Sequence, residues 1–347
     1  MSNRLILFID ELSLEKTIFF FKSHTIAIVG ASIRAESHLV IKEAAKSLNI
    51  PFFIQPKSNE DQYTNFIKNI EALKPDLFLI NSYSMILKKD LLSIPKIKTL
   101  NIHAGLLPKN RGCNPIQWGI INEDKYAGVS LHEVDEGIDT GSIIDQRKTL
   151  IKINDTWASI TERIHSLISE LINENMENIV NNRWVSKLQD DTKALYNRRR
   201  KPEDGIFDWS LPTITIYNLL RALVDPLPGA FYVLNTKKIE LKNFKSIEEI
   251  LHMKYIHHKA SFYTATNNLF EPTLSNDLKE TAHSLNPKLP MFKILFKNSF
   301  KGSFSLSNIN WNDRTTQIRI KHEDVEKQII MMEIRKFIEQ QFHLKIT

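Results

Sequence analysis

An amide and an imidazole stand two residues apart near the middle of the chain, at Asn101 and His103. They end an apolar run that predicts a β-strand, where side chains at i and i+2 point to the same side. An imidazole can accept a proton near neutral pH, and an amide NH₂ can donate to a negatively charged oxygen. Asp139 lies between Gly137 and Gly141 in an expected turn, from which it can approach the histidine and favour its charged form. Taken singly, such residues are more often caps and turns at strand ends.

An alternation of strand and helix signals surrounds these residues and must position them. The expected elements follow in the order strand 4–9, helix 14–21, strand 25–29, helix 37–48, strand 51–54, helix 63–73, strand 75–80 and strand 98–102. Such repetition implies an α/β fold with parallel strands and helices on both faces of the sheet. Because ligands of open α/β sheets bind beyond the carboxyl ends of the strands, the residues after Ile80 and Leu100 are the first candidates for a site.

The pattern changes after residue 126. Two β-type runs, 127–134 and 141–146, are separated by the turn at 135–141, and a long amphipathic helix is expected over 160–180. We expect the first domain to end near residue 185.

Composition excludes several classes of protein. The chain has 347 residues, of which 42% are hydrophobic and 25% charged, as in ordinary globular proteins. No stretch reaches the roughly 20 apolar residues that span a bilayer. The net charge of +6, from 46 basic and 40 acidic residues, suits small anionic ligands as well as nucleic acid.

The single cysteine, Cys113, excludes a disulfide framework. The acidic N-terminal region does not resemble a signal peptide, so we expect a cytoplasmic protein.

Three motifs occur in sequence around the polar residues: NIHAGLLPKNRGCNPIQW at 101–118, GVSLH at 128–132 and DEGIDTGSII at 135–144. Together they resemble the N10-formyltetrahydrofolate-dependent formyltransferases, which share Asn-x-His at a strand end, Leu-Leu-Pro-x-x-Arg-Gly and a downstream Asp-x-Gly. The resemblance covers about residues 1–235 and implies a Rossmann-like, mostly parallel sheet. Asn101, His103 and Asp139 fall on the family's catalytic trio. Ala104 and Gly105 depart from the Pro-Ser of many members, and we expect only a small effect on loop rigidity.

The resemblance implies transfer of a formyl group from N10-formyltetrahydrofolate, as cosubstrate, to an amine. In that reaction Asn101 would stabilise the developing oxyanion by about 3–4 kcal/mol. His103 would assist the oxyanion or take the amine proton, and Asp139 would hold His103. Whether His103 or Asp139 is the base stays open at this point. The reaction needs no cysteine nucleophile, and His252, His257 and His258 lack the partners of a metal site, so we expect no metal.

The family analogy also suggests binding residues. The expected cofactor contacts are Met85, Ile86, Leu87, Asp135, Gly137 and Ile138, and the expected substrate contacts are Lys109, Arg111, Trp118, Arg198 and Phe231. Two of these residues have structural alternatives that fit equally well. Lys109 could be a solvated side chain instead of a phosphate contact, and Arg111 could hold a loop carboxylate instead of a ligand.

The second half of the chain indicates the acceptor. The run RRRKPEDG at 198–205 and the later PGAF at 228–231 resemble the sugar-nucleotide branch of the family. We therefore expect a catalytic domain over 1–185 and a substrate-side extension over 186–235. The expected acceptor is a nucleotide-linked amino sugar, such as a UDP-linked 4-amino-4,6-dideoxy or a dTDP-linked 3- or 4-amino-6-deoxy sugar, for glycan or lipopolysaccharide biosynthesis. We expect no nucleic-acid or membrane partner, and a homodimer is compatible with the sequence. The alternatives are a methionyl-tRNA formyltransferase and a non-catalytic binding module.

Residues 236–347 are expected to form a smaller, accessory α+β domain. The runs 302–310 and 316–320, followed by a final helix, are faintly similar to GNAT-type N-acetyltransferases. Because 321–327 contains no glycine, it lacks the loop that would hold the pyrophosphate of acetyl-CoA. We expect a catalytically silent domain that serves packing, dimerisation or substrate closure.

Overall fold

The computed structural model describes residues 3–10, 15–234, 236–242, 244, 246, 249–250 and 253. The described chain forms two compact units, one of residues up to Asp204 with Arg221–Leu227, the other of Gly205–Leu220 and the residues from Pro228 on. The expected GNAT-like runs and His252, His257 and His258 lie outside the described residues.

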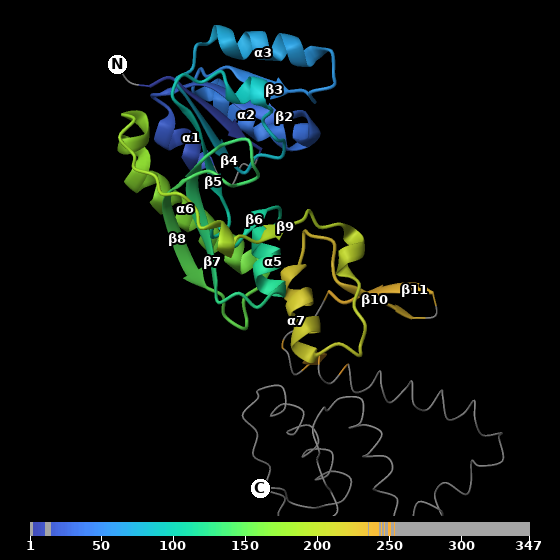
Figure 1. Ribbon diagram of the computed structural model, residues 1–347. Helices are drawn as coiled ribbons and strands as arrows, with labels where there is room; N and C mark the ends of the chain where they lie inside the picture. Colours follow the sequence, from blue (N-terminus) through green and yellow to red (C-terminus); the bar gives the residue numbers. More distant parts are fainter. Residues whose placement is uncertain are drawn as a thin grey trace, which may run out of the picture. The chain divides into compact units, whose positions relative to one another are not determined.

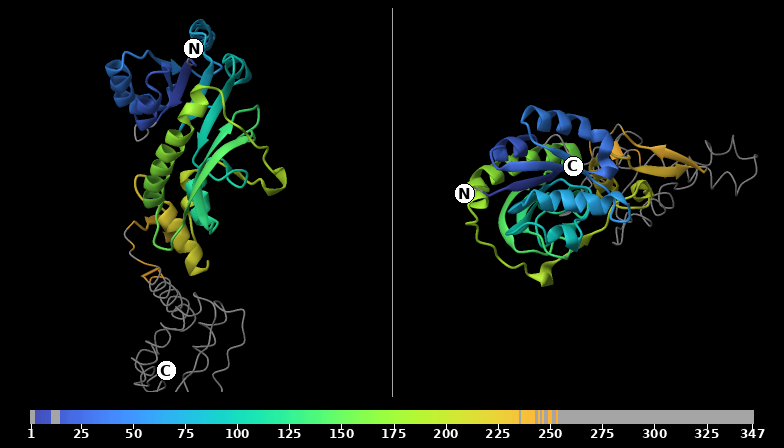
Figure 2. Two further views of the ribbon diagram at one scale, coloured as in Figure 1. Left: turned by 90° about the vertical axis from the view of Figure 1, so that its left-hand side faces the viewer. Right: turned by 90° about the horizontal axis from the view of Figure 1, so that it is seen from above.

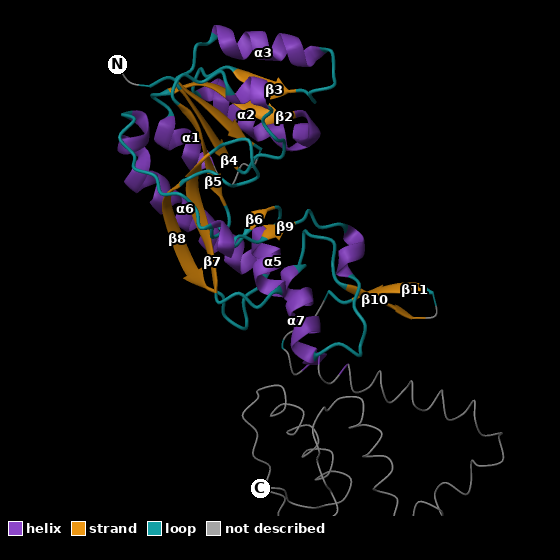
Figure 3. Ribbon diagram, viewed as in Figure 1, coloured by secondary structure: helices purple, strands orange, loops and turns teal. Residues whose placement is uncertain are grey.

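The first unit is built on one seven-stranded sheet, which Figures 1 and 3 show with its helices. Its elements are β1 (Leu5–Ile9), α1 (Glu15–Phe21), β2 (Thr25–Ala31), the 3-10 helix η2 (Ser32–Ser37), α2 (His38–Ser47), β3 (Phe52–Gln55), α3 (Gln62–Ala72), β4 (Leu77–Asn81), α4 (Lys89–Leu92), β5 (Lys98–His103), β6 (Arg111–Gly112), α5 (Pro115–Ile121), β7 (Tyr126–Glu133), β8 (Ile143–Leu150), α6 (Trp157–Val180), η3 (Asp191–Lys193), β9 (Tyr196–Asn197) and most of η4 (Pro202–Gly205).

The strand order β3-β2-β1-β4-β5-β7-β8 confirms the predicted mostly parallel, Rossmann-like sheet. Neighbouring strands from β3 to β5 are parallel, whereas β7 runs antiparallel to β5 and β8 antiparallel to β7. Strand β1 is buried along its whole length, as expected for a strand covered on both faces.

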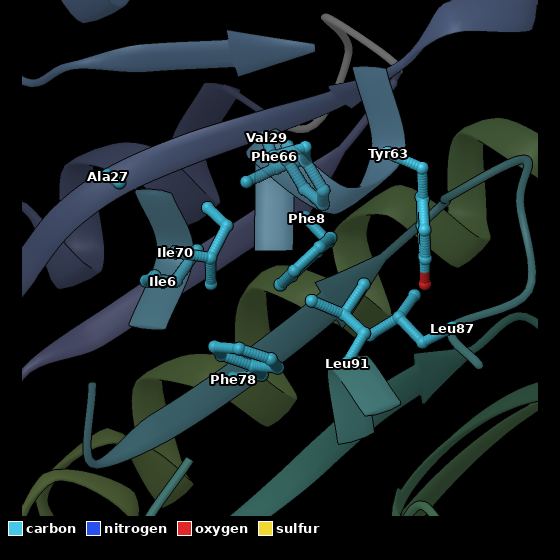
Figure 4. Close-up of a cluster of buried hydrophobic side chains, with 10 residues drawn as sticks. All are labelled: Ile6, Phe8, Ala27, Val29, Tyr63, Phe66, Ile70, Phe78, Leu87 and Leu91. Carbon is cyan, nitrogen blue, oxygen red and sulfur yellow. The ribbon is translucent and has the colours of Figure 1, made fainter. Parts of the chain in front are cut away.

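The two faces of the sheet are covered by different helices. On one face, α3 and the segment around α4 pack on β1, β2 and β4, and Figure 4 shows this core cluster of Ile6, Phe8, Ala27, Val29, Tyr63, Phe66, Ile70, Phe78, Leu87 and Leu91. Helices α1 and α6 pack together, and α6 packs on β7 and β8 (Figure 2). Helix α6 begins with a capping box between Thr156 and Ser159, which satisfies backbone donors of its first turn.

The strand register brings several polar residues to one edge of the sheet. Ile80 of β4 pairs with Asn101 of β5, so the segments that follow β4 and β5 leave the sheet at the same edge. The antiparallel neighbour β7 places His132 directly opposite Asn101. In such a cross-strand pair the two side chains are close enough to touch.

The second unit contains most of α7 (Thr213–Ala222) and the hairpin of β10 (Phe231–Leu234) and β11 (Lys237–Glu240). Phe207, Trp209 and Tyr232 form an aromatic cluster with ring centroids 5.2–5.7 Å apart. In the described part of the chain, no helix is both long and apolar enough to cross a membrane.

Candidate active site

The three side chains singled out in the sequence come together at the carboxyl end of β5. Asn101 Nδ2 lies 3.4 Å from Asp139 Oδ1, and His103 Nδ1 lies 3.6 Å from Asp139 Oδ2. The side chains of His103 and Asp139 are 9% and 14% exposed, so their interactions are little weakened by solvent. An amide donor, an imidazole and a carboxylate thus share one largely buried cluster.

A second histidine, His132, belongs to the same cluster and was not predicted. Its Nε2 lies 3.1 Å from Asn101 Nδ2 and 3.5 Å from Asp139 Oδ1, and its Nδ1 lies 2.7 Å from the Glu133 carbonyl. A carbonyl only accepts, so the proton of neutral His132 is on Nδ1, and Nε2 can accept from the Asn101 amide. His132 therefore orients Asn101.

The surroundings of His103 determine where its proton sits. Nε2 lies 2.7 Å from the Asn110 carbonyl and must donate to it, which leaves the Nδ1 lone pair of neutral His103 facing Asp139. Gly105 makes this contact possible, because a Cβ there would lie 2.6 Å from His103 Nε2 and 2.9 Å from the Asn110 carbonyl. Glycine in place of serine at position 105 therefore affects the position of the His103 imidazole as well as the rigidity of the loop.

Both titratable groups of the cluster favour their deprotonated forms. Burial lowers the pKa of His103 below its ordinary 6.5, although the nearby Asp139 opposes this shift. Burial alone would raise the pKa of Asp139, but the two imidazoles and the Gly112 amide, which donates to Oδ2 at 2.8 Å, lower it to about 2. At neutral pH the cluster therefore holds a neutral imidazole beside an ionised carboxylate.

The loop that carries Asp139 is held from behind by Gln189 and Arg111. Asp139 has a left-handed φ of 54°, which is rare outside glycine. Gln189 Nε2 donates to the carbonyls of Asp139 and Gly141, at 2.8 and 2.7 Å. Gln189 Oε1 accepts from Arg111 Nε and Nη2 at 3.0 and 2.9 Å. Gln189 was also not predicted, and it ties the turn to a buried arginine.

We expect Gln189→Ala to lower kcat about tenfold, because it frees the Asp139 turn and leaves the buried Arg111 short of acceptors. Single-turnover formyl transfer measures the effect. Asn181→Ala, which removes one side-chain hydrogen bond at the exposed end of α6, is the control and should keep normal turnover. Equal activity in both variants would show that the turn does not need Gln189.

The predicted cofactor residues lie on two loops at this edge of the sheet. Met85, Ile86 and Leu87 follow β4; Leu87 is buried in the core, and Ile86 is 69% exposed. The other loop contains Asp135, Gly137 and Ile138, with Ile138 exposed and Asp135 accepting from the Gly137 amide and the Thr140 hydroxyl. Lys89 and Glu136, at 2.7 Å, form an ion pair between α4 and this second loop.

The structure places the predicted substrate residues in different surroundings. Lys109 Nζ pairs with Asp124 at 2.6 Å. Arg111 is 2% exposed and also bonds to Tyr196 and Asp191, at 2.8 and 2.6 Å, which matches the structural alternative of an arginine holding a loop carboxylate. Phe231 is buried in the second unit.

Trp118 and Arg198 do meet. The indole Nε1 donates to the Arg198 carbonyl at 2.9 Å, and the guanidinium carbons of Arg198 and Arg200 lie 5.5 and 5.1 Å from the centre of the Trp118 ring. Arg198 also forms two hydrogen bonds to Asp204, at 2.6 and 2.7 Å. This aromatic and cationic surface is linked to the cluster through β6, whose Gly112 donates to Asp139.

Fold and site together define an α/β protein with a Rossmann-like sheet and an amide–imidazole–carboxylate cluster at the carboxyl end of a central strand. Two models of one family match this chain: the formyl transferase model over residues 19–176, and the formyl transferase C-terminal domain model over residues 199–255. The chain belongs to the formyl transferase family, which is a family of enzymes.

Curated relatives support this membership. The bifunctional polymyxin resistance protein ArnA of Wigglesworthia glossinidia brevipalpis is 36% identical over 199 residues, which are 57% of this chain and 30% of that protein. The methionyl-tRNA formyltransferase of Trichlorobacter lovleyi is 35% identical over 201 residues, 58% of this chain and 62% of that protein. The chain thus spans less than two thirds of the length of either relative.

Solved structures share the fold. A 4-N formyltransferase from Francisella tularensis matches with a TM-score of 0.58 and 18% identity, and a sugar N-formyltransferase from Shewanella sp FDAARGOS_354 with 0.58 and 22%; each match covers 70% of this chain and 98% of the other. WlaRD, a sugar 3N-formyl transferase crystallised in the presence of dTDP and 5-N-formyl-THF, matches with 0.52 and 20% over 69% of this chain and 85% of its own. At such identities the similarity establishes the fold.

Proposed function

We propose that this protein transfers the formyl group of N10-formyltetrahydrofolate to the amine of a nucleotide-linked amino sugar. The observation that carries the proposal is the convergence of Asn101, His103 and Asp139 in one buried cluster at the carboxyl end of β5. A binding module would have no chemical need for these three groups together.

The bound folate would supply an activated formyl group to the acceptor amine. Negative charge develops on the formyl oxygen as the amine attacks, and the Asn101 NH₂, oriented by His132, can donate to that oxygen. Because Asp139 is ionised and weakly basic, with a pKa of about 2, His103 is the better base. Its Nδ1 takes the proton that the amine loses, and Asp139, 3.6 Å away, stabilises the imidazolium. The bond between the formyl carbon and N10 then breaks, His103 returns the proton to N10, and tetrahydrofolate leaves.

The two loops at the edge of the sheet fit the folate. A pterin is a flat ring that needs apolar cover and hydrogen bonds along its edge. Ile86 and Ile138 offer exposed apolar side chains. Within the described chain, the backbone amide and carbonyl groups of Met85 and Ile86 have no hydrogen-bonding partner, so they are free to pair with such an edge.

Several observations favour a sugar nucleotide as the acceptor. Trp118 and Arg200 provide an aromatic ring and a guanidinium, which suit the base and the diphosphate of a nucleotide, whereas Arg198 is paired with Asp204. The two solved structures above that are named as sugar N-formyl transferases, the one from Shewanella and WlaRD, are matched over 98% and 85% of their lengths. Asp204 partly neutralises the basic run, which weakens the case for a large nucleic acid.

Methionyl-tRNA is the second candidate acceptor. The observation in its favour is that curated relatives at 34–37% identity are named methionyl-tRNA formyltransferases, with 55–66% of their lengths matched.

One experiment separates the two acceptors. The full chain is incubated with N10-formyltetrahydrofolate and either a panel of nucleotide-linked amino sugars or charged initiator tRNA, and the products are analysed by mass spectrometry. The proposal predicts that at least one sugar nucleotide gains a formyl group and that the tRNA does not. Formylation of the tRNA alone would replace the sugar with the second candidate, and no formylation of any acceptor would contradict the proposal.

The oxyanion role of Asn101 predicts a large loss of rate. In Asn101→Ala we expect kcat to fall by about 10²–10³-fold with little change in KM, because the amide acts mainly on charge that develops during the reaction. Steady-state kinetics at saturating cosubstrate measure both constants. A kcat within twofold of wild type would remove Asn101 from the mechanism.

The lowered pKa of His103 predicts the pH profile. An imidazole must be neutral to act as a base. Because the pKa of His103 is below 6.5, its ring remains neutral at pH values at which a free imidazole is already protonated. Single-turnover transfer should therefore be constant around pH 7 and fall on acidification with a midpoint below 6.5, after correction for the ionisation of the acceptor amine. A midpoint at or above 6.5 would contradict a buried neutral base.

A further inference from the structure

A second buried carboxylate, Asp10, lies outside the cluster of Asn101, His103 and Asp139. Asp10 follows β1 at the same edge of the sheet and is 6% exposed. Its Oδ1 accepts from the Ala31 amide at 2.7 Å and lies 3.1 Å from His38 Nε2, and its Oδ2 accepts from the Ser84 amide at 2.7 Å. One carboxylate therefore joins the ends of β1 and β2, the start of α2 and the segment after β4.

That segment turns sharply as it leaves the sheet. Ser82 has a left-handed φ of 52°, which costs free energy in a residue other than glycine and persists only where neighbours hold it. The Asp10 amide donates to the Ser82 carbonyl at 3.1 Å, and the Asp10 carboxylate receives the Ser84 amide. Backbone and side chain of Asp10 thus hold the turn on both sides of Tyr83.

The other end of the segment is held by packing. Leu87 is buried beside Leu91 in the core cluster (Figure 4), and the Tyr83 hydroxyl donates to Gln55 at 2.8 Å. Met85 and Ile86 lie between these fixed points, with their backbone groups unpaired within the described chain. A backbone stretch held at both ends can present hydrogen-bonding groups without paying ordering entropy on binding.

We propose that Asp10 is a positioning residue for the folate, acting through the main chain of residues 84–87, with His38 orienting its carboxylate. This inference rests on the proposed function, since it assumes that the loop after β4 binds the pterin. The interaction is made before binding, so Asp10 governs folate affinity and has no part in the chemical step.

The test measures the Kd of the stable analogue 5-formyltetrahydrofolate by calorimetry on the full chain. Asp10→Asn keeps the shape of the side chain and replaces one acceptor oxygen by an NH₂ donor. We expect its Kd and its KM for N10-formyltetrahydrofolate to rise about tenfold, with kcat at saturation within twofold of wild type. The matched control is Asp76→Asn, where a carboxylate before β4, at the opposite edge, accepts from the Arg4 amide at 2.8 Å. Its folate affinity should not change.

A second variant keeps the role of Asp10 testable if the Asp10→Asn protein does not fold. His38→Phe retains a buried ring but removes the hydrogen bond to Asp10, and we expect about a threefold weaker Kd. Wild-type protein that binds no folate would overturn the proposed function. If the wild-type protein binds folate and a folded Asp10→Asn variant binds it equally well, only the role of Asp10 is overturned. If Asp10→Asn does not fold, equal binding by His38→Phe overturns that role instead.

Discussion

Replacing His103 by alanine should reduce kcat/KM by about 10²–10⁴-fold, the range typical of a lost general base. The reason is geometric: Nε2 is committed to the Asn110 carbonyl, and the remaining Nδ1 lone pair faces the only carboxylate of the cluster, Asp139. Single-turnover transfer from N10-formyltetrahydrofolate to the preferred acceptor gives the rate of the chemical step.

A matched control separates this effect from a loss of folding. His24→Ala removes a histidine at the opposite edge of the sheet, where its ring contacts the Ser23 hydroxyl, and should leave the rate unchanged. Circular dichroism must show both variants folded. A folded His103→Ala protein with near-wild-type turnover would exclude the imidazole as the base.

Replacing Asp139 by asparagine should cost about 10³-fold in kcat. A unit charge about 4 Å from an imidazolium contributes about 4 kcal/mol at the effective dielectric constant of a protein site, and each 1.4 kcal/mol is a factor of ten. The asparagine oxygen can still accept from the Gly112 amide, so the turn should keep its conformation. The variant tests the charge of the carboxylate, measured as kcat at saturating concentrations of both substrates.

Asp190→Asn is the control for Asp139. Asp190 lies beside Gln189, is exposed and pairs with Lys193 at 2.8 Å, so loss of its charge should leave kcat within twofold of wild type. If Asp139→Asn also stayed within tenfold of wild type, the stabilisation of His103 by a charge would be refuted.

The fold was largely predictable because its signals are local. Each parallel strand is a short apolar run with turn residues at its ends, and the amphipathic spacing at 63–73 corresponds to α3. The meeting of Asn101 and His103 was predictable from strand alternation alone. Predicting that Asp139 joins them also required the family motif, because Asp139 is distant from both residues in sequence.

His132 and Gln189 were not predictable from local patterns. His132 reaches Asn101 because β7 pairs antiparallel with β5 in one particular register, and an apolar run does not specify its partner strand. Gln189 lies in a segment without periodicity and meets the turn 48–50 residues away in sequence. Its role follows only from the folded structure, in which the Gln189 side-chain amide contacts the carbonyls of Asp139 and Gly141 and the Arg111 guanidinium.

The substrate residues depend on tertiary contacts in the same way. Arg111 and Lys109 have charges that suit a phosphate, but protein partners occupy both: Gln189 and Asp191 surround the first, and Asp124 pairs with the second. Charge and position in a motif do not reveal such partners, because the partners come from other elements.

A crystal structure of the protein with 5-formyltetrahydrofolate would show whether Asn101, His103 and Asp139 face the bound folate. We expect the pterin edge to lie against the backbone of residues 85–87. We also expect the N10 side of the folate to lie within reach of Asn101 Nδ2 and His103. A folate bound at another edge of the sheet, or the cluster closed off from the bound folate by protein, would contradict these expectations.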